Sequence, residues 1–246
     1  MTKREASGSS MYDFPAVVKA SRRFYKNHDL ALWAKAIPRR PTPAHDVESL
    51  LEQANKSGFR AAFAFPPFAL QQQSFDRLVD ACARQPSPLL PDNQQYRQPF
   101  LADNWTRVAN GKILQRDDDL GERTRGAYIF LFATAPLANC WGKTGKQIAE
   151  QFQARGWHGL TVFEYLVLQR VFAERFGDHR FFAEPEDPSG HWLWLIDSMT
   201  DADCTVALGS SRGINLQATG INNRESKRAG IGGVIVPLAD ELPHSN

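Results

Sequence analysis

Two helix-initiation signals in tandem, between Gly142 and Phe176, constrain the fold more than any other feature of the sequence. Thr144 is followed three residues later by Gln147, and Thr161 is followed by Glu164 at the same spacing. In a capping box the threonine hydroxyl accepts from the third amide of the helix, while the Gln or Glu side chain returns to the threonine amide. The sequence therefore predicts two successive helices that begin at these threonines.

The two predicted helices differ in how much of their surface is apolar. In the first, Ile148 and Phe152 share one face, and Gly156 is placed to end the helix in a left-handed conformation. The second, ending near Phe176, is apolar around most of its circumference, which is typical of a helix buried in a core. We expect this pair to form the buried scaffold of the C-terminal half.

Apolar runs rich in aromatic and β-branched residues predict the strands. The strongest run, residues 127–134, is apolar on both faces and is expected at the centre of a sheet. A second strand is expected at 59–65, and a weak strand or hairpin between 100 and 114 with its turn at Asn110-Gly111. Four short runs after the helices predict an antiparallel meander: 191–196, 204–208, 214–218 and 233–236.

These elements predict an α+β fold, with the two capped helices packed on a small, mostly antiparallel sheet and a helix-rich N-terminal region. Residues 1–10 are expected to form a disordered tail, followed by the helix-rich region at 11–84. The proline-rich segment 85–99 is expected to be a linker or a surface loop. The α+β domain then occupies 100–246.

The compartment is predicted from hydropathy and cysteine usage. No apolar run approaches the roughly 20 residues needed to span a bilayer, and the N-terminus MTKREASGSS has no apolar core of a signal peptide. The cysteines Cys82, Cys140 and Cys204 are odd in number and widely separated, which favours free thiols over disulfides. We therefore expect a cytoplasmic protein.

Positive charge gathers at the N-terminal end. Residues 1–40 hold nine Lys or Arg against three Asp or Glu, whereas the whole chain has a net charge of only +2. A helix or helix pair is expected from Phe14 to Lys35, with its cations in an arc of about 100°: Lys19, Arg22, Arg23 and Lys26. Such a face is either a solvated surface or a binding surface for phosphates of nucleic acid or anionic lipid.

Tryptophans mark a second candidate binding surface. Trp192 and Trp194 alternate with leucines, so both should point to the same side of their strand. They either pack on the capped helices or form an exposed aromatic patch on which a ligand could stack.

A nucleotide site is the first enzymatic alternative. The apolar strand 127–134, Lys143 and Thr144 at a helix start, and Asp197 after a strand follow the order of a phosphate loop and its carboxylate. A phosphate loop requires glycine where Leu137 stands, so the motif would be degenerate and the helix cap explains Lys143 and Thr144 more simply.

A cysteine and histidine hydrolase is the second enzymatic alternative. Cys140 or Cys204 could meet a histidine in space, because the members of a catalytic triad need not be adjacent in sequence; the candidates are His158, His179 and His191. The run Asp117-Asp118-Asp119 lacks the alternate spacing of a calcium loop and predicts a solvated turn. No metal site and no cofactor are predicted.

The succession TGKQIAEQF, GWHGLTVFEYLVLQ, FGDH, WLWLIDS and GIGGVIVP resembles a pattern of conserved bacterial proteins of unknown function. The resemblance covers residues 142 to 236. It implies a bacterial or mobile-element origin and a modular C-terminal half, and it transfers no activity and no catalytic residue to this chain.

We expect a non-enzymatic interaction or accessory protein that binds an anionic partner such as nucleic acid, or a protein partner. The basic N-terminal helix or the aromatic patch would supply the contact. The alternative is an enzyme of one of the two classes above.

Overall fold

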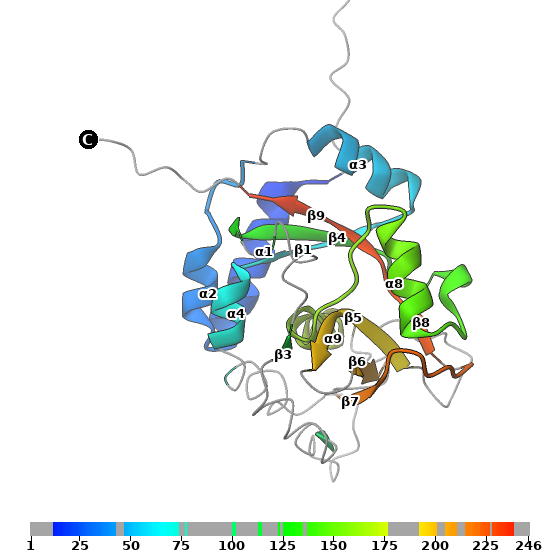
Figure 1. Cartoon of the computed structure of the whole chain (residues 1–246). Coiled ribbons are helices and arrows are strands. Elements are labelled where there is room, and N and C mark those ends of the chain that lie inside the picture. The colour runs from blue at the N-terminus through cyan, green and yellow to red at the C-terminus, as the bar shows by residue number, and fades with distance from the viewer. Residues whose placement is uncertain are drawn as a thin grey trace, which may run out of the picture.

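A computed structural model describes residues 12–42, 47–73, 77, 100–101, 113–114, 123, 125–134, 137–176, 192–200, 205–210, 215–226 and 228–238. Its elements follow the order α1 (Phe14–Asn27), α2 (Ala31–Ala36), α3 (Val47–Lys56), β1 (Ala61–Phe65), α4 (Phe68–Gln73), β2 (Phe100–Leu101), β3 (Ile113–Leu114), β4 (Tyr128–Phe132), η1 (Ala138–Cys140), α8 (Gly145–Gln153), α9 (Val162–Phe176), β5 (Trp192–Thr200), β6 (Thr205–Ser210), β7 (Asn215–Gly220), β8 (Arg228–Gly230) and β9 (Gly233–Pro237). The mixed composition of helices and mostly antiparallel strands confirms the predicted α+β class (Figure 1). The predicted tail at 1–10 and the segment 85–99 lie outside the described residues.

A three-stranded antiparallel sheet, in the order β1-β4-β9, forms the centre of the molecule. The middle strand β4 is buried along its whole length, as predicted for residues 127–134. The sheet joins β1, from the helix-rich N-terminal region, to two strands that are far away in the sequence. One hydrophobic core accordingly includes side chains from both regions.

Helix α1 covers the free edge of β1. The Ser21 hydroxyl accepts from the amide of Ala64 at 2.9 Å, and the Tyr25 hydroxyl donates to the carbonyl of Ala64 at 3.0 Å. An edge strand with free amides and carbonyls is a template for pairing with another chain. These two side chains satisfy the outward amide and carbonyl of Ala64 and hold α1 against that edge.

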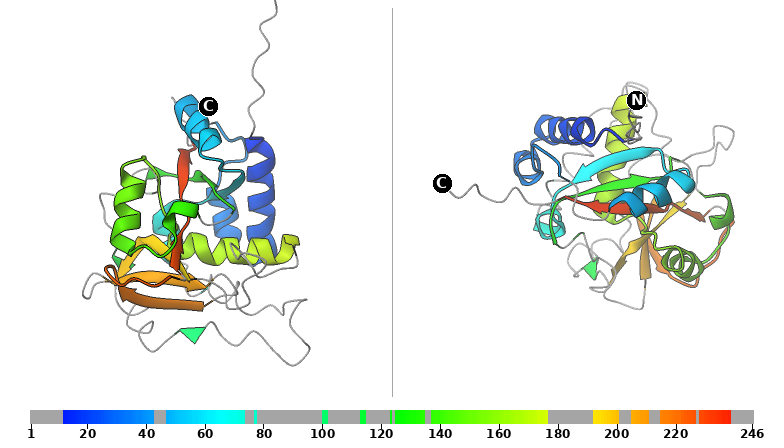
Figure 2. Two further views of the ribbon diagram at one scale, coloured as in Figure 1. Left: turned by 90° about the vertical axis from the view of Figure 1, so that its right-hand side faces the viewer. Right: turned by 90° about the horizontal axis from the view of Figure 1, so that it is seen from above.

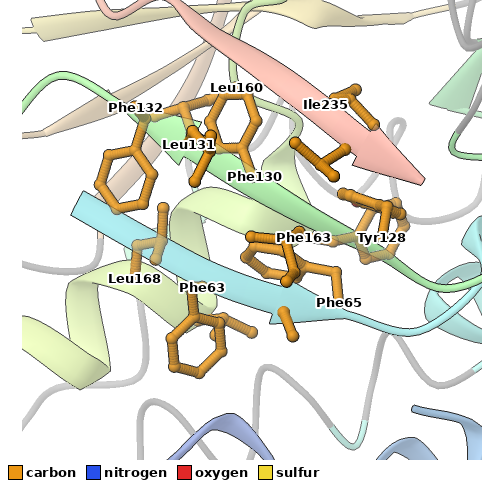
Figure 3. Close-up of a cluster of buried hydrophobic side chains, with 14 of the residues drawn as sticks. Phe63, Phe65, Tyr128, Phe130, Leu131, Phe132, Leu160, Phe163, Leu168 and Ile235 are labelled. Carbon is orange, nitrogen blue, oxygen red and sulfur yellow. The ribbon is translucent and has the colours of Figure 1, made fainter. Parts of the chain in front are cut away.

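The core around this sheet is rich in phenyl rings. Figure 3 shows Phe63 and Phe65 of β1, Phe130 of β4 and Phe163 of α9 gathered in one buried cluster. Burial of each such side chain contributes about 1.5 to 3 kcal/mol to the free energy of unfolding. Aromatic pairs such as Phe63 and Phe65, whose ring centroids lie 5.4 Å apart, fix the relative orientation of the side chains.

The larger sheet has the order β2-β7-β6-β5-β3, and β8 also pairs with β5. The antiparallel pairing of β5 with β6 and of β6 with β7 confirms the first three strands of the predicted meander. Helix α9 lies between the two sheets, as Figure 1 and the left view of Figure 2 show. It contacts β5 and β6.

Both predicted capping boxes are present. The Thr144 hydroxyl accepts from the Gln147 amide, and the Gln147 side chain accepts from the Thr144 amide. The Thr161 and Glu164 pair makes the same two bonds, at 3.2 and 2.8 Å. Gly156 has a φ of 62°, so it ends α8 in the predicted left-handed conformation.

One prediction about strand pairing is wrong. Strand β9 is not the fourth strand of the meander, because it pairs with β4 in the smaller sheet, where four of its five residues are buried. Gly233 makes this close pairing possible, since a Cβ there would lie 2.5 Å from the Leu131 carbonyl oxygen. The stretch 100–114 contains two short strands, β2 and β3, which lie at opposite ends of the larger sheet and pair with β7 and β5. The expected turn at Asn110-Gly111 lies outside the described residues.

None of the helices in the described part of the chain has the length and apolar character needed to span a bilayer.

Candidate functional site

The basic face of α1, defined as Lys19, Arg22, Arg23 and Lys26, is the strongest candidate binding surface. Asp13 caps the helix by accepting from the Ala16 amide, and buried Phe14, Val18, Phe24 and Tyr25 attach the opposite side to the core. Lys19, Arg23 and Lys26 are exposed, and none of the three forms an ion pair with another described residue. No acidic residue lies within α1. Lys19, Arg23 and Lys26 therefore present positive charge to solvent on one side of α1.

Arg22 occupies the border of this face and is partly buried. Its guanidinium donates to the carbonyl of Ile37, just beyond the end of α2. The bond attaches the segment after α2 to the cationic side of α1. Arg39 and Arg40 follow Ile37 by two and three residues, and both are exposed.

The two tryptophans of the predicted aromatic patch differ in exposure. Trp194 is fully buried among Cys140, Ile148 and Phe152, and its indole Nε1 donates to the Lys143 carbonyl at 3.2 Å. Trp192 is only half-buried. Because Trp194 packs on α8, the described surface does not carry a pair of stacked indoles at this position.

The residues of the alternative nucleotide site all have protein partners. Lys143 donates to the Gln151 side chain at 2.8 Å, and Thr144 is occupied by the capping box. The Lys146 amide at the start of α8 donates to the Ile221 carbonyl. A phosphate at a helix start needs free amides, and the amides of Lys146 and Gln147 are already bonded.

Asp197, the third residue of that alternative, belongs to a buried ionic cluster that the sequence analysis missed. Its carboxylate accepts from Arg123, a residue shortly before β4. Arg123 also forms a two-bond ion pair with Glu164, in which Nε and Nη2 donate to the two carboxylate oxygens at 2.8 and 2.9 Å. Nη2 donates further to the carbonyl of Gly159 at 2.7 Å, so all the nitrogens of this buried guanidinium are bonded.

Polar side chains around the cluster complete its hydrogen bonds. Tyr128 donates to Glu164 at 2.7 Å, and Gln71 donates to the Tyr128 hydroxyl at 3.1 Å. The partly exposed imidazole of His158 lies 3.7 Å from Asp197. One signal in the sequence indicates this arrangement: Glu164 and Asp197 each interrupt an apolar run, and a buried carboxylate requires a cation.

The cluster shifts the pKa values of its members. Burial disfavours the charged form of Asp197, but the Arg123 guanidinium and His158 outweigh it and hold the pKa of that carboxyl below its usual range. Burial likewise opposes the charge of Arg123, but Glu164, Asp197 and Tyr128 raise its pKa further above the ordinary value. Asp197 and Arg123 therefore stay charged at neutral pH, and the hydrogen bonds of the cluster tie β4, α9 and β5 together.

Cys140 is a free, buried thiol, and burial raises its pKa to about 11. Such a thiol is protonated at neutral pH and is a weak nucleophile. The other residues of the predicted cysteine and histidine site, except His158, lie outside the described residues: Cys82, Cys204, His179 and His191.

The residues 117–119 also lie outside the described part of the chain. Within that part, no group of three or more His, Cys, Asp and Glu side chains is arranged to hold a metal ion.

Comparison of the chain with known proteins finds no relative. The chain matches no protein-family model, no curated protein and no solved structure.

Proposed function

We propose that this chain is a non-enzymatic interaction or accessory protein that binds an anionic partner through the basic face of α1. The single observation that carries the proposal is the exposure of Lys19, Arg23 and Lys26 on one side of a well-anchored helix, without an acidic partner among the described residues. Several cations on one surface raise the local concentration of an anion and increase its rate of association.

The state of the candidate catalytic groups supports a binding function over catalysis. Asp197 accepts a hydrogen bond from Arg123, and Lys143 donates one to Gln151. The Thr144 hydroxyl accepts from the Gln147 amide in the helix cap. The raised pKa of Cys140 favours the unreactive thiol. We place the protein in the cytoplasm, where a free buried thiol such as Cys140 stays reduced.

Retention on the polyanion heparin tests the proposal. The variant K19Q/K26Q removes two exposed charges from the basic face, while K56Q/K146Q removes two exposed lysines from α3 and α8 and serves as the matched control. Glutamine has nearly the helix propensity of lysine, so both variants should fold. We expect K19Q/K26Q to elute at clearly lower salt than the control. Equal elution of the two variants would reject the basic face as the binding surface.

A further inference from the structure

The outer arc of α1 contains only small or polar side chains between its cations. Its other exposed residues are Pro15, Ala16, Ala20 and Asn27. Helices that lie in a membrane surface bury bulky apolar residues such as Trp, Phe or Leu in the lipid, and this arc presents none. The arc therefore lacks the side chains that would insert into lipid, which favours a polar anionic partner.

The spacing of the cations fits a chain of phosphates. Lys19, Arg23 and Lys26 are distributed over eight residues of helix, and the rise from Lys19 to Lys26 is about 10 Å. Duplex DNA carries one phosphate per strand about every 3.4 Å of axis, and because the strand winds around that axis its neighbouring phosphates lie roughly 7 Å apart. A row of cations about 10 Å long therefore reaches about two successive phosphates. Ala16 and Ala20 have short side chains, which let the helix backbone approach such a strand closely.

Further exposed cations follow the segment to which Arg22 is bonded. Because Arg22 lies at the border of the cationic arc and bonds to the Ile37 carbonyl, the chain after α2 is held on that side of the helix. Exposed Arg39 and Arg40 lie in this segment. Arginine donates to phosphate oxygens through two parallel N–H groups, which suits it to a backbone contact.

We infer that the anionic partner is the phosphate backbone of nucleic acid, bound without regard to base sequence by a surface that combines the basic face of α1 with Arg39 and Arg40. This inference rests on the proposed function, which requires only some anionic partner.

Fluorescence anisotropy with labelled DNA of mixed sequence, about 20 nucleotides long as duplex and as single strand, measures the affinity at several salt concentrations. Co-sedimentation with phosphatidylcholine and phosphatidylserine vesicles measures lipid binding. The proteins compared are the parent chain, K19Q/K26Q, R39Q/R40Q and the control K56Q/K146Q. The conservative variant R39K/R40K keeps both charges.

We expect K19Q/K26Q and R39Q/R40Q each to weaken DNA binding about tenfold, and each to lower the slope of log K against log salt by about 2 on duplex. The control should match the parent, and R39K/R40K should recover most of the affinity and the slope. If the slope of log K against log salt is unchanged in R39Q/R40Q, Arg39 and Arg40 do not contact the DNA.

Binding to anionic vesicles with no binding to either DNA would overturn the inference and leave the proposed function standing. Equal heparin elution of K19Q/K26Q and its control would instead reject the proposed function itself. The two failures are thus distinguished by different measurements.

Discussion

Glu164 caps the N-terminus of α9 and neutralises Arg123 with the same carboxylate. One oxygen accepts from the Thr161 amide and from Arg123 Nη2, while the other accepts from Arg123 Nε and from the Tyr128 hydroxyl. Four donors thus meet one buried side chain, and the helix start is bonded to the segment before β4. A local capping motif has become part of the tertiary structure.

Because Arg123 and Glu164 form a buried ion pair, removing Arg123 is expected to lower the free energy of unfolding strongly. We expect Arg123→Met to lower the free energy of unfolding by about 3 to 5 kcal/mol, because Glu164 would stay buried without its main counter-charge. Urea denaturation at neutral pH measures the change. The control is Arg125→Met two residues away, on an exposed side chain, which should cost about 1 kcal/mol or less. Equal effects of the two substitutions would contradict the structural role of Arg123.

Asp197 predicts a loss of stability in acid. Its pKa is lower in the folded protein than in the unfolded chain, so falling pH protonates the unfolded chain first. Its contribution to the free energy of unfolding is therefore complete above the ordinary aspartate pKa of about 3.9, and it declines as pH falls further. We expect the stability difference between the parent and Asp197→Asn to shrink as the pH falls below about 4.

Urea denaturation at several pH values measures this difference. Glu150→Gln, on an exposed side chain of α8, provides the control, and its difference from the parent should change much less over the same range. A difference for Asp197→Asn that stays constant with pH would show that the carboxyl titrates alike in both states.

The close packing around Gly233 predicts that a larger side chain at this position destabilises the central sheet. An added Cβ would lie 2.5 Å from the Leu131 carbonyl oxygen and 2.6 Å from the Phe130 ring, so β4 and β9 would have to separate. We expect Gly233→Ala to lower the free energy of unfolding by about 1 to 3 kcal/mol. The control Gly220→Ala has no neighbour closer than 3.7 Å and should be neutral or slightly stabilising. Thermal unfolding compares the two, and a stable Gly233→Ala protein would refute the close approach.

The buried thiol of Cys140 is expected to react slowly with alkylating reagents. With its pKa raised to about 11 by burial, only about one thiol in a thousand is ionised at pH 8, and the thiolate is the reactive form. We expect iodoacetamide to leave Cys140 largely unmodified in the folded protein and to label it rapidly in urea. Peptide mass spectrometry separates Cys140 from Cys82 and Cys204. Rapid labelling of native Cys140 would revive the cysteine hydrolase alternative.

The sequence alone determined the features that depend on neighbours along the chain. The capping boxes at Thr144 and Thr161, the left-handed Gly156 and the amphipathic helix α1 all follow from side chains within four residues of one another. Such interactions have the same geometry wherever the helix is placed. The buried character of β4 could be predicted for a similar reason, since its run of apolar residues has no polar face.

Only the tertiary structure decided how distant segments meet. Nothing local distinguishes β9 from a meander strand, and its place beside β4 depends on the room that Gly233 leaves for Phe130. Arg123 likewise has no local partner: its two carboxylates, Glu164 and Asp197, come from positions 41 and 74 residues away. Contacts of this kind are selected by the free energy of burying charge and volume in one shared core, to which the whole chain contributes.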